Sequence, residues 1–285
     1  MFPSSVHDLL LPLLALLTGL LLGTLGSGGS ILALPAFVYA ANLPVKSAIA
    51  TSLAVVGMTS LIGAVLAKRK CSAHGCPGQE VDVGVTAMMT VGGLVGAFLG
   101  AHLAANVPAR TQMLLFGIVM LGAATAMFRR SNTDVSGHSP AAGDVSDRKP
   151  PRILVPILGL GVGMLTGLVG VGGGFLIVPV LTLMAGVPVK RAASMSLWII
   201  AVNSVAGLVG YIGHVSVAWG AAALFLVFSV FSMIVGQRVA ERAQPQRLQR
   251  TFAVFLVVVA CFTLFKAQAA EAHVRSIAAS SAHRE

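Results

Sequence analysis

Long apolar segments alternate with short polar connections along the whole chain. Apolar runs of about 20 residues are long enough to cross a bilayer as helices. The pattern therefore predicts an all-α, polytopic membrane protein. The expected segments fall at 8–26, 29–42, 46–67, 83–105 and 110–128, and then at 152–170, 173–186, 190–212, 216–238 and 248–266.

The second half of the chain repeats the first half. With Pro35 set against Pro179, the two halves align without a gap from Gly19 to Gly63. The aligned pairs include Gly19 with Gly163, Pro44-Val45-Lys46 with Pro188-Val189-Lys190, Ser52 with Ser196, Ser60 with Ser204, and Gly63 with Gly207. We predict two homologous repeats of about five helical segments each, at 1–128 and 152–267. A polar linker at 129–151 joins them, and a polar tail follows at 268–285.

The orientation of the repeats depends on how often each crosses the membrane. Five crossings per repeat would invert one repeat relative to the other and place most Lys and Arg residues on one side. If the short second segment instead dips in and returns, the basic residues divide more evenly. The positive-inside rule favours inverted repeats. We therefore expect a cytoplasmic linker and both termini outside.

Composition narrows the class of protein further. Of 285 residues, 56% are hydrophobic and 10% are charged, whereas a soluble domain carries about 25% charged residues. The formal net charge of +10 comes from basic residues in the connections, as the positive-inside rule describes for membrane proteins. No basic patch is interleaved with aromatic residues. We expect the lipid bilayer as a partner and no nucleic acid.

A glycine-rich turn occurs at the same place in both repeats, as Gly26-Ser27-Gly28-Gly29-Ser30 and as Gly170-Val171-Gly172-Gly173-Gly174. Each turn precedes a segment that spans about 21 Å as a helix, which is short of a bilayer core of about 30 Å. We therefore predict short broken helices at these turns. Paired helix breaks of this kind mark the binding sites of secondary transporters. The alternative is that the glycines only allow close packing of helices.

The expected chemistry at these turns is anion binding. Glycine permits the positive φ of a backbone N–H nest, and a helix N-terminus adds unpaired N–H groups with partial positive charge. Hydroxyl and amide side chains on the third segments could complete the site, or could only join helices. The predicted substrate-binding residues are Gly26, Ser27, Gly28, Gly29, Ser30, Ser52, Gly170, Gly172, Gly173, Gly174, Ser196 and Asn203. Thr51, Ser194 and Ser204 are further candidates.

We predict no catalytic residue, no metal site and no cofactor. Cys71, His74 and Cys76 lie close together in an expected loop, but they supply one ligand fewer than a structural zinc site needs. A disulfide or a pair of inert thiols is the alternative for the two cysteines. Cys261 is expected to pack within an apolar helix.

The motif Gly-Val-Gly-Gly-Gly-Phe-Leu-Ile-Val-Pro at 170–179 and its partner at 26–35 resemble the sulfite exporter TauE/SafE family of membrane permeases. The Pro-Val-Lys motifs and the Gly213-His214-Val215 turn are similar to this family too. The resemblance implies a transporter for sulfite, an organosulfonate or a related organic anion in a bacterial cytoplasmic (inner) membrane. The first turn departs from the pattern at Ser27 and Ser30. A homodimer is an open alternative to a single copy.

Two other functions compete with transport. A non-transporting membrane scaffold or assembly factor would need no paired helix breaks. An intramembrane hydrolase would need Ser27 as nucleophile, but Ser27 aligns with Val171, and no His within the membrane is placed as its base. We therefore expect a transporter that is not an enzyme.

Overall fold

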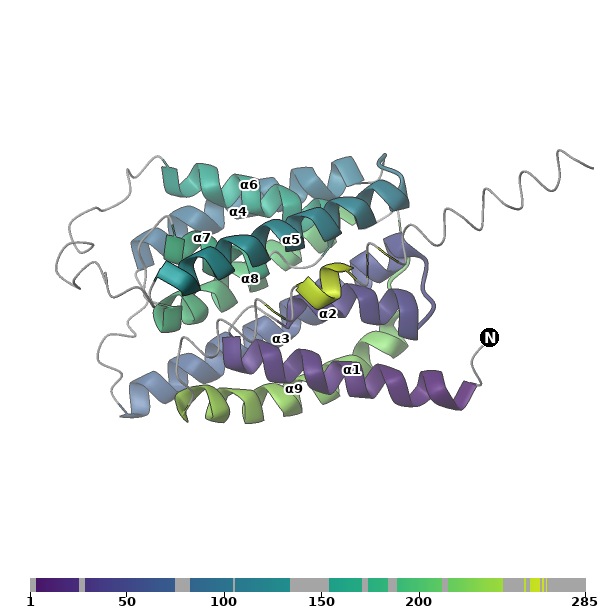
Figure 1. The fold of residues 1–285 in the computed structure, drawn as a ribbon, viewed down its shortest axis with the longest axis horizontal. Coiled ribbons are helices and arrows are strands. Elements are labelled where there is room, and N and C mark those ends of the chain that lie inside the picture. The colour runs from purple at the N-terminus through teal and green to yellow at the C-terminus, as the bar shows by residue number, and fades with distance from the viewer. Residues whose placement is uncertain are drawn as a thin grey trace, which may run out of the picture.

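The computed structural model describes residues 4–25, 29–74, 83–104, 106–133, 154–170, 174–183, 189–211 and 215–242, together with 254, 257–261, 263 and 265. The described residues form helices and no strand (Figure 1), which confirms the all-α prediction. The helices are α1 (Ser4–Leu25), α2 (Ser30–Pro35) with its π-helical continuation η1 (Ala36–Ala40), α3 (Val45–His74), α4 (Val83–Ala104), α5 (Ala109–Thr133), α6 (Leu154–Val169), α7 (Gly174–Leu183), α8 (Val189–Tyr211) and α9 (Trp219–Arg242).

Long apolar helices occur together with shorter apolar ones, as expected for a polytopic membrane protein. Four stretches of the described chain are long and apolar enough to cross a membrane: Val45–Arg69, Gly84–Ala104, Arg191–Tyr211 and Trp219–Val239. The segments after the glycine turns are much shorter. One runs over Ser30–Ala40, and the other, α7, has 10 residues and a length of about 15 Å. The prediction of short broken helices is confirmed.

Helix ends differ from the predicted segment ends where charged residues continue a helix. α3 runs to His74, so the prediction that Cys71 and His74 lie in a loop is wrong. The residues after Ala67 include no Gly or Pro before Gly75, and Lys and Arg are good helix formers. In the same way α5 continues to Thr133, inside the expected linker.

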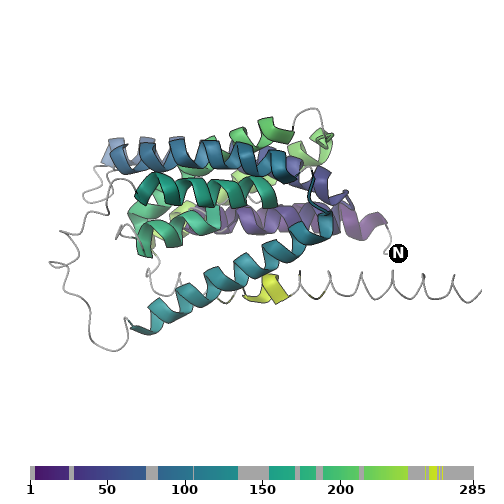
Figure 2. The same cartoon turned by 90° about the horizontal axis from the view of Figure 1, so that it is seen from above.

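Two helix pairs pack so closely that glycine is required between them. A Cβ atom on Gly163 of α6 would lie 2.1 Å from the carbonyl oxygen of Gly93 on α4, and one on Gly19 of α1 would lie 2.0 Å from that of Ser229 on α9. The first helix of each predicted repeat thus packs against the fourth helix of the other (Figure 1, Figure 2). Glycine therefore allows these helices to pack closely, as small residues do between membrane helices.

α3 and α8 cross at the centre of the structure in antiparallel directions. A Cβ atom on Gly207 would lie 3.3 Å from Leu53 Cδ1, and one on Gly63 would lie 3.6 Å from Leu197 Cδ1. Residue numbers therefore rise along one helix as they fall along the other. The sequence alignment pairs Leu53 with Leu197 and Gly63 with Gly207, so each contact is the counterpart of the other. This arrangement favours inverted repeats. The repeat and its inversion stay predictions.

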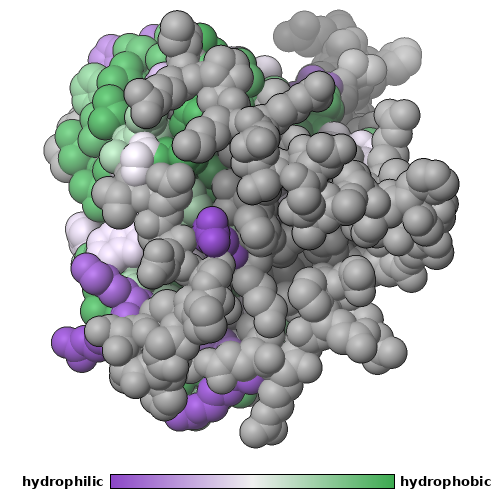
Figure 3. Space-filling model, turned by 90° about the vertical axis from the view of Figure 1, so that its left-hand side faces the viewer, coloured by the Kyte–Doolittle hydropathy of each residue, from purple (hydrophilic) through white to green (hydrophobic). Residues whose placement is uncertain are grey.

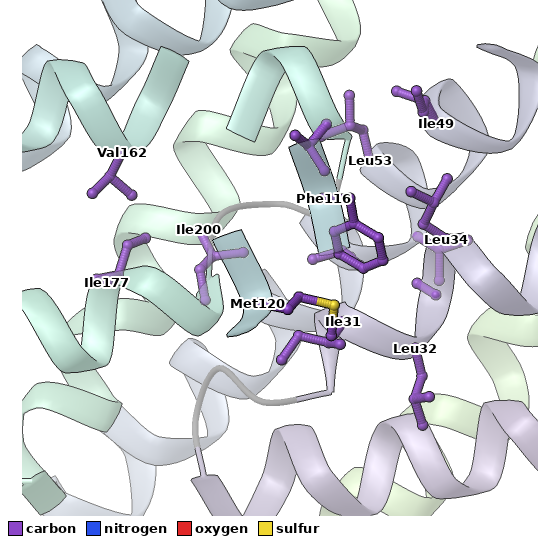
Figure 4. Close-up of a cluster of buried hydrophobic side chains, with 14 of the residues drawn as sticks. Ile31, Leu32, Leu34, Ile49, Leu53, Phe116, Met120, Val162, Ile177 and Ile200 are labelled. Carbon is purple, nitrogen blue, oxygen red and sulfur yellow. The ribbon is translucent and has the colours of Figure 1, made fainter. Parts of the chain in front are cut away.

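The core and the surface are both apolar. A buried cluster draws its side chains from α2, α3, α5, α6, α7 and α8 (Figure 4), including Ile31, Ile49, Phe116, Ile177 and Ile200. Large apolar side chains are also exposed on the outside of the bundle; Val91, Val227, Phe231 and Phe265 are more than 60% exposed. An apolar outer surface suits a lipid environment, because lipid tails are as apolar as these side chains.

Cys261 does not pack within the protein. Its side chain is exposed, so the expectation that it packs within an apolar helix is wrong.

Basic residues gather at one end of the molecule. Lys68 and Arg69 are exposed near the end of α3, and Arg238 is exposed near the end of α9. These helix ends point the same way, because Thr51 of α3 bonds to Ala218 just before α9, and Gly63 of α3 lies against Met233 of α9. Figure 3 views this end of the molecule and shows hydrophilic surface there. The expected cytoplasmic side would be this one.

Candidate functional site

The second glycine turn begins with a backbone conformation that favours glycine. Gly170 follows α6 directly, is buried and has φ +75°. This confirms the expected positive φ at Gly170. Its N–H donates to the Thr166 carbonyl oxygen at 2.8 Å. A Cβ atom on Gly170 would also lie 2.1 Å from Ile49 Cγ2 of α3. Both the backbone conformation and the neighbouring side chain therefore exclude a larger residue.

Hydroxyl groups from other helices bind the carbonyls at the end of α6. Ser52 Oγ of α3 lies 2.5 Å from the Gly170 carbonyl oxygen, and the Tyr211 hydroxyl of α8 donates to the Gly167 carbonyl oxygen at 3.1 Å. The last carbonyl oxygens of a helix have no N–H donor within the helix and need other donors when they are buried. The end of α6 is therefore fixed by side chains from both predicted repeats.

Ser52 is a positioning residue in this conformation. Its side chain is fully buried, and its hydroxyl also lies 2.8 Å from the Ile49 carbonyl oxygen. A serine hydroxyl has one proton to donate. Because both of its close partners are carbonyl oxygens, Ser52 holds the Gly170 turn in place and does not offer its proton to an anion.

The first glycine turn uses glycine for a different reason. Gly29 has a helical φ of −68° at the start of α2. A Cβ atom there would lie 2.0 Å from the Thr18 carbonyl oxygen of α1. Glycine is therefore required at this position by the close approach of α2 to α1, and not by a positive φ. Ser30 is fully buried at the next position.

Part of the predicted site lies outside the described residues: Gly26, Ser27, Gly28, Gly172 and Gly173. Gly174 is the first residue of α7, and the first N–H groups of a helix have no acceptor within it. The structure thus brings Ser52 next to Gly170, at a break whose far side is the N-terminus of α7.

Ser196 repeats the local geometry of Ser52. It is fully buried, and its hydroxyl donates to the Ala193 carbonyl oxygen, three residues earlier, at 2.8 Å. Ser52 makes the same contact with Ile49. Ser52 and Ser196 are partners in the sequence alignment, so the two predicted repeats share this local contact.

Asn203 lies elsewhere on α8, one helical turn before Gly207. It is 1% exposed and sits against Gly93 of α4, where a Cβ atom would lie 2.5 Å from Asn203 Nδ2. Its Oδ1 atom has no hydrogen-bond partner among the residues that the structure describes. The Asn203 side chain therefore faces α4.

The hydroxyl of Thr51 has a structural role. Its hydroxyl lies 2.7 Å from the Ser47 carbonyl oxygen and accepts a hydrogen bond from the Ala218 backbone N–H at 3.1 Å. It therefore joins α3 to the segment before α9. Tyr211 was missed as a candidate because its alignment partner is Ala67, and only its hydroxyl near a buried apolar helix end could have indicated a role.

The sequence profile of the sulfite exporter TauE/SafE family matches residues 11–263. The chain belongs to this family. The TauE/SafE resemblance in the glycine motifs is therefore confirmed over most of the chain. It follows that this TauE/SafE protein is a member of a family of membrane transporters.

Curated relatives agree with the TauE/SafE assignment. A probable membrane transporter protein of Methanocaldococcus jannaschii is 30% identical over 279 residues, covering 90% of this chain and 96% of its own. A probable membrane transporter protein of Xylella fastidiosa is 29% identical, with 89% and 93% covered. The sulfite exporter TauE/SafE family protein 6 of Arabidopsis thaliana is 27% identical over 132 residues, with 46% and 31% covered. No solved structure matches this TauE/SafE chain.

Proposed function

We propose that this protein is a permease for a small oxyanion, sulfite or an organosulfonate, in a bacterial inner membrane. The observation that carries the proposal is the break after α6. There Gly170 adopts φ +75°, and a hydroxyl from the other predicted repeat binds its carbonyl. Backbone that leaves the helix within the membrane is tolerated where protein buries it or where it lines a path, and transporter sites are built from such breaks.

The anion would bind to backbone N–H groups. Gly172, Gly173 and Gly174 lead into the N-terminus of α7, where N–H groups and the helix dipole favour negative charge. The carbonyl oxygens of Gly167 and Gly170 already accept hydrogen bonds from hydroxyl groups of the protein. Because these oxygens point toward their donors, they repel the anion less. Gly26 to Ser30 would supply the equivalent contacts from the first repeat.

The charge of the protein suits an anion that must leave again. No Asp or Glu occurs between residues 83 and 133 or between 148 and 240, so these stretches hold no carboxylate that would repel the substrate. Neutral N–H and O–H donors bind an oxyanion without a full countercharge. A bound oxyanion is therefore held weakly enough to be released on the other side.

Uptake of radiolabelled sulfite into proteoliposomes tests the proposal. We expect uptake of labelled sulfite. Unlabelled sulfite and organosulfonates should inhibit this uptake, and carboxylates should inhibit it less. Gly172→Leu and Gly173→Leu should abolish uptake, and Gly161→Ala, at a site with open space around it, is the matched control. No uptake of any oxyanion by folded protein would favour the scaffold. Release of a hydrolysed product would favour the hydrolase.

A further inference from the structure

Helices α1, α3 and α9 form one bundle of parallel helices. The Ser229 hydroxyl of α9 donates to the Ala15 carbonyl oxygen of α1. Further along both helices, a Cβ atom on Gly23 would lie 2.2 Å from the Met233 carbonyl oxygen, so residue numbers rise together. Gly63, in the second half of α3, lies against Met233 as well. We call α1, α3 and α9 the first bundle.

Helices α4, α6 and α8 form a second bundle, and they too are parallel to one another. The contacts that fix their directions pair Gly93 with Gly163, Ala101 with Gly167, Gly93 with Asn203, and Ala101 with Gly210. Because α3 and α8 are antiparallel, the second bundle runs opposite to the first. Figure 1 shows the second bundle in the upper part of the molecule and the first bundle in the lower part.

The bundles do not coincide with the predicted repeats. The first bundle takes α1 and α3 from the first repeat and α9 from the second. The second bundle takes α6 and α8 from the second repeat and α4 from the first. The sequence alignment makes α6 the counterpart of α1, and α8 the counterpart of α3. Each repeat therefore gives one helix to the bundle of the other.

Packing inside the bundles differs from packing between them. Inside the second bundle, a Cβ atom on Gly167 of α6 would lie 2.1 Å from a carbonyl oxygen of α4, so backbone lies against backbone. Where α3 crosses α8, side chains make the contact. A Cβ atom on Gly57 would lie 3.1 Å from Ser204 Cβ, and one on Gly207 would lie 3.3 Å from Leu53 Cδ1. Side chains can repack when helices slide past one another, whereas interlocked backbones move as one unit.

The two glycine turns lie on opposite sides of this boundary. Gly29 packs against α1 in the first bundle, and Gly170 follows α6 in the second. From α3, the Ser52 hydroxyl reaches across to the Gly170 carbonyl oxygen. Ile49 of α3 also lies against Gly170. A tilt of one bundle against the other would therefore change the distance between the turns and break the Ser52 bond.

We propose that the two bundles, and not the two repeats, are the rigid units that move during transport. They rock about the crossing of α3 and α8, so that the space between the glycine turns opens to one side of the membrane and then to the other. The hydrogen bond from Ser52 to Gly170 holds the arrangement described above and breaks in the opposite one. This inference rests on the proposed permease, because it gives the route by which the anion reaches and leaves its site.

Distances between spin labels test which units move. The full-length protein, with its three native cysteines replaced by alanine, would carry pairs of labelled cysteines at exposed positions. Two pairs join different repeats within one bundle: Leu13 with Val239, and Leu103 with Ile157. Two further pairs join different bundles within one repeat, at opposite ends of the molecule: Lys68 with Met88, and Val209 with Leu224.

We expect one distance for each pair within a bundle and two distances for each pair between bundles. Sulfite should change only the proportions of the two distances, because a ligand shifts the populations of existing states. Rocking closes one end as it opens the other, so the shorter distance of Lys68–Met88 should accompany the longer distance of Val209–Leu224. Two distances for Leu13–Val239, with one for Lys68–Met88, would mean that the repeats move and would overturn the proposal.

Ser52→Ala tests the hydrogen bond between the bundles. We expect it to lower the population of the described arrangement by about threefold or more, the effect of one hydrogen bond. Ser229→Ala is the matched control, because its hydroxyl also bonds to a carbonyl of another helix, but within the first bundle. Its proportions should equal those of the wild type. Unchanged proportions in Ser52→Ala would refute the role of this bond.

The moving bundles and the proposed function can fail separately. A single distance for all four pairs, with and without sulfite, in a protein that takes up sulfite would overturn the moving bundles and leave the permease. Two distances between the bundles, in a folded protein that takes up no oxyanion, would support the motion and refute the proposed substrate.

Discussion

The hydroxyl of Ser52 on α3 donates a hydrogen bond to the carbonyl oxygen of Gly170, 2.5 Å away, across 118 residues of sequence. The contact joins the third helix of the first predicted repeat to the glycine turn of the second. It sets the direction of the Gly170 carbonyl, and the peptide plane in turn sets the direction of the next N–H group. Ser52 therefore controls the geometry of the turn from outside it.

Replacement of Ser52 by alanine should impair transport more than folding. The change leaves a buried carbonyl without its donor, which costs about 1–3 kcal/mol, and it frees the turn to rotate. We expect sulfite uptake to fall about tenfold or more, the equivalent of about 1.4 kcal/mol. Proteoliposome uptake at matched protein density measures the effect. Thr59→Val, which removes a hydroxyl bonded to its own helix, should leave uptake near the wild-type value.

Gly170→Ala should destabilise the protein through two separate effects. The φ of +75° costs a residue with a Cβ atom about 1–2 kcal/mol, and the new methyl group would overlap Ile49. A double-mutant cycle with Ile49→Ala separates them. We expect the double variant to lose at least about 1 kcal/mol less than the sum of the single losses. Additive losses, measured by thermal unfolding in detergent, would mean that only the backbone conformation matters.

Two glycines of α6 should respond in opposite ways to alanine. A Cβ atom on Gly163 would lie 2.1 Å from the Gly93 carbonyl oxygen, whereas Gly161 has nothing within 4 Å. Gly163→Ala must push α6 away from α4 and should cost about 1–3 kcal/mol. Gly161→Ala should be neutral or stabilise by up to about 1 kcal/mol, as in an open helix position. Similar melting temperatures for the two variants would contradict the close packing of α4 and α6.

The number of crossings per repeat can be tested with reporter fusions. Five crossings place the linker on the opposite side from both termini, and a returning second segment places all three on the same side. We expect alkaline phosphatase to be active when it is fused after residue 285 and inactive when it is fused after residue 140. Fluorescent protein fusions at the same positions should give the reverse pattern. Activity at both positions would reject the inverted arrangement that the antiparallel α3 and α8 favour.

Hydropathy predicted where helices lie but not where they end. The predicted third segment stops at 67, whereas α3 continues to His74, because basic residues end an apolar run without breaking a helix. Cys71 and His74, which were expected in a loop, therefore lie in a helix. Boundaries that depend on hydrogen bonding of the backbone are not visible in the hydropathy pattern.

The candidate functional site, like the helices, could be predicted from the sequence only in part. Glycine at position 170 was readable as a turn with positive φ, since glycine is the residue that adopts it without cost. The roles of Ser52 and Thr51 were not readable, because a buried hydroxyl can serve a ligand or a carbonyl equally well by its chemistry. Only the position of the Gly170 carbonyl and of the Ala218 N–H assigned them.

The sequence by itself determined that this chain is an all-α membrane protein of the TauE/SafE family with two glycine breaks, because apolar run length and glycine spacing act locally along the chain. Only the tertiary structure decided which groups meet at those breaks. Contacts such as Ser52 with Gly170, or Leu53 with Gly207, join residues more than 100 positions apart, and they depend on how helices cross. That crossing follows from packing of whole helix faces, which no local pattern in the sequence specifies.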